Sequence, residues 1–148
     1  MDLFTIGHST RTLDELIRIL QTYGIKTLVD VRRFPGSKKF PHFNRENLEK
    51  VLPKHSIRYC WLGESLGGFR KGGYKEYIKT EEFEHGINQL LTIAKKARTA
   101  IMCSEIVWFR CHRNYISEHL VRIEHQVIHI VNEKRKYEHK LRKNPKVS

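Results

Sequence analysis

The sequence predicts an α/β fold, in which an open sheet of about five mostly parallel strands carries helices on both faces. Three observations support this prediction. Short apolar segments recur along the 148 residues, amphipathic segments with helical spacing separate them, and the apolar segments end in polar or glycine-containing turns. This alternation is typical of βαβ units. The length suits one sizeable core, so we expect a single domain over residues 1–148, a three-layer sandwich of the Rossmann-like type.

Five apolar runs are the expected strands, because they are short, rich in Ile, Val and Leu, and bounded by glycine or polar residues. In chain order they are residues 3–6, 27–31, 57–62, 99–103 and 127–131.

The expected helices follow these strands. Thr12 and Glu15 make a capping box ahead of leucines and isoleucines at helical spacing. Asn44 can cap a short helix, and Thr80 can cap a longer one with its own apolar face. A further helix is expected after Cys111.

The charge balance favours an anionic partner, because 28 Lys and Arg face 16 Asp and Glu, for a net charge of +12. Nucleic acid or a nucleotide is the first candidate, and a basic surface without a specific partner is the alternative. Part of the excess lies in a basic tail from about residue 132. Its Glu, Lys and Arg alternation predicts a helix that Asn144 and Pro145 stop, with frayed final residues.

Composition also limits the class of protein. No apolar run approaches the ~20 residues of a membrane helix, and the first residues lack a signal-peptide pattern. Three cysteines are an odd number, which favours reduced thiols. We therefore expect a cytoplasmic protein with no membrane partner and no cofactor.

The strand ends predict the position of a functional site. The carboxyl ends of parallel strands gather along one edge of a sheet. Polar groups follow four of the expected strands: His8 and Ser9, Asp30 and Arg32, Glu64 and Ser65, and Cys103, Ser104 and Glu105. This coincidence predicts a cleft, against the alternative of ordinary polar loops.

Several motifs support an anion site at this cleft, and each has a structural alternative. His8 and Ser9 follow a glycine, where backbone amides can approach an anion, but an ordinary βα turn has the same sequence. Arg32 suits a phosphate, but an ion pair with Asp30 could simply order the loop. Aromatic residues interleaved with lysines near Ser37 suit nucleobases or core packing. A glycine-rich segment containing Gly67 and Gly68 suggests a mobile lid or a surface loop.

Cys103 and Cys111 allow two further interpretations. Their spacing lacks the Cys-x-x-Cys pairs of structural zinc sites, so no metal is expected. Cys103 could be a thiolate nucleophile near arginines, although the gap to them exceeds the tight Cys and Arg cradle of rhodanese-like and thiol-phosphatase loops. Buried thiols that act as small apolar side chains are the alternative.

Taken together, these motifs resemble the domain of unknown function 488 family of bacteria and archaea. The resemblance rests on the segments Thr5–Ser9, Val29–Arg32, Phe40–Asn44, Leu62–Gly68, Met102–Glu105 and Cys111–Arg113, and it covers about residues 3–130. It implies an α/β fold without a settled activity. One departure is Val107-Trp108, where members carry Asp-Pro.

The leading functional hypothesis is an enzyme that hydrolyses a glycosidic or phosphoester bond of a nucleotide or nucleic acid. Asp30 or Glu105 would be the general base or charge stabiliser, and His8 and His112 would handle protons. The substrate-binding candidates are Ser9, Arg32, Ser37, Gly67, Gly68 and Arg113, and the thiol candidates are Cys103 and Cys111. The Glu105 carboxylate should need a partner such as Arg113, His112 or helix amides. A non-catalytic binding module and a thiol enzyme using Cys103 are the alternatives.

Overall fold

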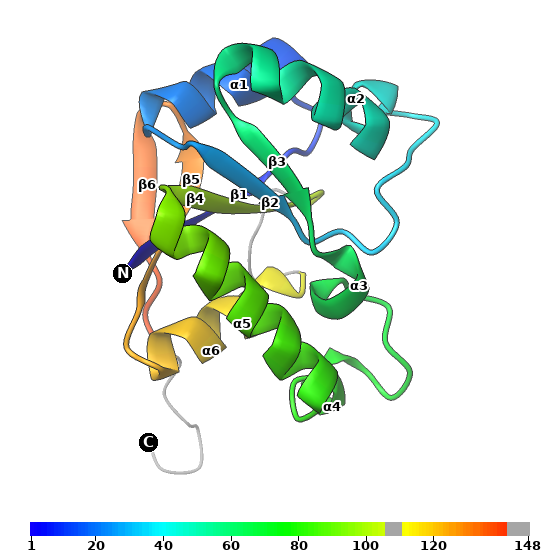
Figure 1. Cartoon of the computed structure of the whole chain (residues 1–148), viewed down its shortest axis with the longest axis vertical. Helices are drawn as coiled ribbons and strands as arrows, with labels where there is room; N and C mark the ends of the chain where they lie inside the picture. Colours follow the sequence, from blue (N-terminus) through cyan, green and yellow to red (C-terminus); the bar gives the residue numbers. More distant parts are fainter. Residues whose placement is uncertain (106–110, 142–148) are drawn as a thin grey trace.

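A computed structural model describes residues 1–105 and 111–141 of the chain. A single sheet of six strands forms its centre, in the order β3-β2-β4-β1-β5-β6 (Figure 1). The first five strands run parallel and β6 is antiparallel to β5, so the predicted open, mostly parallel sheet is confirmed. The strands are β1 (Asp2–Gly7), β2 (Thr27–Asp30), β3 (Arg58–Trp61), β4 (Thr99–Cys103), β5 (Gln126–Asn132) and β6 (Arg135–Glu138).

Helices cover both faces of the sheet, as predicted. On one face lie α1 (Leu13–Thr22) and α2 (Arg45–Val51), and on the other lie α5 (Glu81–Lys96) and α6 (Arg113–Arg122) (Figure 1). Two separate apolar cores result, one on each face. Shorter helices complete the chain: the 3-10 helices Pro41–Phe43 and Leu52–His55, and the single turns α3 (Gly63–Leu66) and α4 (Tyr74–Tyr77).

The predicted helix starts at Thr12, Asn44 and Thr80 are confirmed, and the predicted side-chain cap is present at two of them. Thr12 and Glu15 form the complete capping box of α1, and the Thr80 hydroxyl accepts a hydrogen bond from Phe83 N at 3.2 Å. Asn44 precedes α2 but does not cap it with its side chain. Its amide oxygen instead accepts a hydrogen bond from Ser37 N at 2.6 Å, which ties the preceding loop to the helix.

The predicted helix in the basic tail is wrong where the structure describes the tail. Residues 135–138 form β6, which pairs with the open edge of β5. All four β6 residues are exposed, so backbone pairing rather than burial favours the strand. The predicted stop at Asn144 and Pro145 lies outside the described residues.

The topology places a crevice at the carboxyl ends of the strands. Gly7 at the end of β1 pairs in register with Cys103 at the end of β4, and Asp30 at the end of β2 pairs with Met102. The chain leaves β1 and β2 toward one face and leaves β4 toward the other. Ligand sites of open α/β sheets lie at such a switch of direction. No helix in the described part of the chain is long and apolar enough to cross a membrane.

Candidate functional site

A cavity of about 1090 Å³ lies at this edge of the sheet. Its lining includes three cations, Arg32, Arg33 and Lys39, and one carboxylate, that of Glu105. Asp30 offsets the charge of Arg32, and Arg33 and Lys39 against Glu105 still leave a positive balance, which favours an anionic ligand.

Nine of the twelve residues predicted for the site line this cavity. They are His8, Ser9, Arg32, Ser37, Gly68, Cys103, Glu105, Cys111 and His112. The other three, Asp30, Gly67 and Arg113, are buried and do not belong to the lining. Their contacts give them supporting positions.

The Asp30 carboxylate is fully buried and holds Arg32 in place. Arg32 donates from Nε to Oδ1 at 2.9 Å and from Nη2 to Oδ2 at 2.7 Å, and the Tyr59 hydroxyl also donates to Oδ2. Arg32 Nη2 donates further to the Phe43 carbonyl at 2.7 Å, and Nη1 donates to His8 Nε2 at 3.3 Å. The ion pair therefore orders the loop and presents the guanidinium to the cavity.

The two site histidines are neutral at pH 7. Burial lowers the pKa of His8 to about 4 and that of His112 to about 4. His8 accepts from Arg32 at Nε2, which places its proton on Nδ1, 2.9 Å from the Ser9 carbonyl. His112 donates from Nε2 to the Val31 carbonyl at 2.7 Å. Both rings thus act as fixed hydrogen-bonding groups in this geometry.

Two thiols meet in the cavity wall. Sγ of Cys103 lies 3.1 Å from Sγ of Cys111, although the residues are eight apart in sequence. Cys103 is 2% exposed, and its burial raises the pKa of its thiol well above the usual value. The hydrogen bond from Cys103, together with Arg113, lowers the pKa of Cys111 to about 6. Cys111 is half-buried, so the more acidic thiol is also the more accessible one.

Arg113 is the largest fully buried side chain in the described part of the molecule. Its backbone N and its Nε both donate to Cys111 Sγ at 3.4 Å, and its Nη2 donates to the Glu105 carbonyl at 2.5 Å. No ion pair within residues 1–105 and 111–141 contains Arg113. A thiolate on Cys111 would therefore accept two hydrogen bonds from a residue whose guanidinium pairs with no described carboxylate.

A chain of hydrogen bonds continues from Arg113 across the sheet. Arg113 Nη1 donates to Thr5 Oγ1 at 3.3 Å, and Thr5 donates to His129 Nδ1 at 2.6 Å. His129 Nε2 lies 2.8 Å from His139 Nδ1, and His139 Nε2 lies 2.9 Å from a Glu118 carboxylate oxygen. Because the Glu118 carboxylate can only accept, neutral His139 donates to it from Nε2 and accepts at Nδ1 from His129 Nε2, and His129 Nδ1 then accepts from the Thr5 hydroxyl. This chain fixes the orientation of the guanidinium.

Glu105 corrects one expectation. The residue is exposed rather than buried, so its carboxylate can be hydrated and does not require a protein partner. Arg113 contacts the backbone carbonyl of Glu105 instead of its side chain.

The two glycines predicted to contact substrate have a packing role. A β-carbon on Gly67 would lie 2.3 Å from the Gly63 carbonyl oxygen and 2.6 Å from Cβ of Arg33. A β-carbon on Gly68 would lie 3.3 Å from Nδ1 of His112. Both positions therefore let the segment after α3 approach the cavity wall closely.

The comparisons place the chain in a family. The family model described as "Domain of unknown function DUF488" matches residues 12–120, from the start of α1 to the last turn of α6. The chain belongs to the DUF488 family. No curated protein and no solved structure matches it. The match includes both thiols and Arg113, whereas His8 and Ser9 precede it. The position at which this chain departs from the family pattern, residues 107 and 108, lies outside the described residues.

The sequence analysis did not identify several residues that line this cavity or support Arg113 behind it. Thr5, His129 and His139 lie in or beside strands, where nothing in the sequence connects them to Arg113. Phe34, Phe69 and Tyr74 also line the cavity. The sequence could have indicated Phe69 as a ligand-contacting residue, because it lies between glycines and outside any expected strand or helix.

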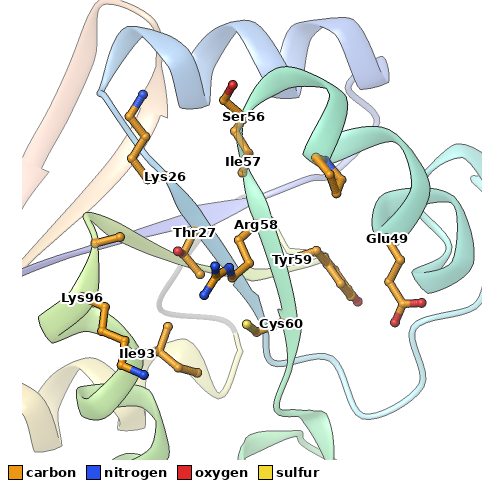
Figure 2. A pocket seen from close by; sticks show the side chains of 12 residues that line it. Lys26, Thr27, Glu49, Ser56, Ile57, Arg58, Tyr59, Cys60, Ile93 and Lys96 are labelled. Carbon is orange, nitrogen blue, oxygen red and sulfur yellow. The ribbon is translucent and has the colours of Figure 1, made fainter.

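The described residues hold no group of three or more His, Cys, Asp or Glu side chains that could bind a metal. A second cavity, of about 710 Å³, lies along the edge strand β3 and the start of β2 (Figure 2). Lys26, Arg58 and Lys96 line it, and none of the predicted site residues does. The chemistry-bearing groups therefore concentrate in the strand-end cavity.

We expect mild acid to destabilise the fold through its buried histidines. Burial lowers the pKa of His8 and His112 to about 4 and that of His129 to about 3, against 6.5 in the unfolded chain. The unfolded state therefore binds more protons below pH 6.5. The free energy of unfolding should fall by on the order of 1 kcal/mol per pH unit for each histidine. Urea titrations between about pH 7 and pH 5 measure this slope.

The exposed His55 supplies the control for this measurement. His55→Gln removes an exposed histidine and serves as the matched variant, whereas His129→Gln removes a buried ring whose pKa is lowered to about 3 and should reduce the slope. A free energy of unfolding that stays constant down to about pH 5 would contradict the neutral state of the three buried rings.

Proposed function

We propose that this DUF488 chain is a dithiol–disulfide oxidoreductase that reduces a sulfur–sulfur bond of an anionic substrate. The observation that carries the proposal is the pair of sulfurs 3.1 Å apart in the wall of a cationic cavity. One thiol is accessible and acidic, and the other is buried and less acidic. This asymmetry is what a nucleophilic and a resolving thiol need.

The reaction balances without a cofactor. The Cys111 thiolate attacks one sulfur of the substrate disulfide, and the other sulfur leaves as a thiolate. Cys103 then loses its proton to the leaving group and attacks Cys111 Sγ, which releases the second substrate sulfur. The products are one substrate thiol, which carries the proton from Cys103, one substrate thiolate and a Cys103–Cys111 disulfide. An external dithiol reductant returns the protein to its starting state.

The hydrolase that the sequence suggested is a weaker candidate in this geometry. Both oxygens of Asp30 are engaged by Arg32 and Tyr59, and the carboxylate does not line the cavity. His8 and His112 have pKa values of about 4 and are held by backbone carbonyls, so neither is tuned as a general acid near neutrality. Only Glu105 remains as an accessible carboxylate in the lining.

The test uses a Cys60→Ser background, which leaves only the paired thiols. Equilibration with oxidised and reduced glutathione, followed by thiol-specific mass labelling, should show a two-electron transition in which both labels disappear together. Reduction of glutathione disulfide, coupled to a dithiol reductant, should be lost in Cys111→Ser. Cys103→Ser should instead accumulate a mixed disulfide on Cys111.

Several outcomes would reject the proposal. The two labels could persist under oxidising conditions, or Cys103→Ser could turn over glutathione disulfide at the original rate. Hydrolysis of a phosphoester or glycosidic bond that survives Cys111→Ser but not Glu105→Gln would favour the hydrolase. A ligand bound equally well by both cysteine variants, without turnover, would favour a binding module.

A further inference from the structure

We propose that Phe34 and Phe69 form a stacking platform for the planar ring of a nucleoside phosphate, whose phosphate is held by the cations of the same cavity. This inference rests on the proposed function in one respect: the nucleoside phosphate would be the anionic part of the substrate that binds beside the two thiols. The phosphate could belong to a free nucleotide or to the end of a single strand.

The first observation is the exposure of two aromatic rings at the cavity. Phe34 is 67% exposed and Phe69 is 82% exposed, whereas the other exposed large apolar residues in the described chain reach only 40–46%. Both rings line the cavity, and their centroids lie 5.9 Å apart at an interplanar angle of 37°. Two loops 35 positions apart in sequence thus bring bare rings together beside a site, which marks them as a contact surface for a ligand.

The second observation is that the rings are held in place. Arg33 Nη1 donates to the Phe69 carbonyl at 2.6 Å, and the Arg33 guanidinium lies 5.5 Å from the centroid of the Phe34 ring. Phe69 adopts a φ of 59°, a left-handed conformation that is unfavourable for a bulky residue. Gly67 packs closely against the backbone of Arg33, which brings the two loops together. Arg33 therefore connects both halves of the platform.

The third observation is the charge beside the rings. Arg32 reaches the cavity from its ion pair with Asp30, and the exposed Lys39 lies in the same lining. A purely apolar partner would leave Lys39 and Arg33, which form no ion pair in the described residues, without an anion, and inorganic phosphate would leave the rings bare. A ligand with a flat ring and a phosphate satisfies both features, and base stacking on aromatic side chains is a common way to bind nucleotides.

The test is calorimetric titration with three probes: AMP, ribose 5-phosphate and adenosine. AMP should bind, and ribose 5-phosphate should bind at least about tenfold more weakly because it lacks the ring. Phe34→Leu and Phe69→Leu should each weaken AMP binding about 5- to 100-fold and leave ribose 5-phosphate unchanged. Phe69→Tyr should retain AMP binding. Ile123→Ala, at an exposed apolar residue of the α6 end, is the matched control and should change nothing.

A 5′-phosphorylated DNA hexamer separates the two sources of the phosphate. Hexamer binding that is tighter than AMP binding and falls steeply with salt would identify a single strand, and equal affinities would identify a free nucleotide. Equal binding of AMP and ribose 5-phosphate, unchanged AMP binding in both leucine variants, or no AMP binding would overturn the platform. If the thiol tests fail but the leucine variants still lose AMP binding, the proposed disulfide reduction is rejected and the stacking platform is not.

Discussion

Arg113→Met is expected to raise the pKa of the Cys111 thiol from about 6 toward that of a free thiol and to slow its alkylation near pH 6.5 at least about tenfold. The hydrogen bond from Cys103 is the largest cause of the low pKa and is retained in this variant. Arg113 then contributes its charge and two hydrogen bonds to Cys111 Sγ, and these are lost. Iodoacetamide rates across a pH series, in the Cys60→Ser background, measure the shift.

Methionine keeps the unbranched aliphatic part of the side chain and removes the guanidinium, with its charge and its hydrogen bonds. Arg113 is buried and belongs to no ion pair of the described residues, so an apolar replacement leaves no carboxylate unpaired there. Arg113→Lys supplies the matched control, because it retains the charge without the planar fork. An unchanged rate profile in Arg113→Met would show that the cation does not activate the thiol.

The hydrogen-bond chain behind Arg113 gives a graded version of the same test. Thr5→Val removes the hydroxyl that accepts from Arg113 and donates to His129, and Thr5→Ser restores it. We expect a smaller rise of the Cys111 pKa in Thr5→Val, and recovery in Thr5→Ser. A structural defect alone would change the free energy of unfolding without shifting the pH profile of alkylation.

The sequence predicted the parts of the fold that depend on local patterns. Apolar runs located five strands, and the capping threonines located the starts of α1 and α5. The tail was mispredicted because its charge alternation also suits a strand with two exposed faces. The open edge of β5 decided between helix and strand, and a residue's own neighbours do not reveal such an edge.

The position of the strand-end cavity was also predictable from the sequence, whereas the roles of the residues that line it were not. Parallel strands bring His8, Arg32 and Cys103 to one edge in any such sheet. The sequence suggested Cys103 as a nucleophile, whereas the geometry favours Cys111, which is the more accessible thiol and accepts two hydrogen bonds from Arg113. That assignment depends on burial and on Arg113, whose orientation is fixed through Thr5, over a hundred residues earlier in the chain.

Asp30→Asn is expected to have the largest effect on stability, about 3–5 kcal/mol in the free energy of unfolding. The asparagine would leave the buried guanidinium of Arg32 without an anion and would break its paired hydrogen bonds. Urea unfolding measures the loss. Glu49→Gln is the matched control, because Glu49 forms an equally short ion pair with Arg45 at the surface, 2.7 Å, and should cost less than about 1 kcal/mol.

The double variant Asp30→Asn with Arg32→Gln separates a lost ion pair from general damage to the core. If the cost of Asp30→Asn comes from an uncompensated cation, removing that cation should recover a large part of the stability. Additive losses in the double variant would contradict this explanation. Because Arg32 also lines the cavity, the double variant should bind AMP more weakly than Glu49→Gln even where its stability is recovered. The alkylation profile of Cys111 should stay unchanged, because Arg113 and Cys103 remain in place.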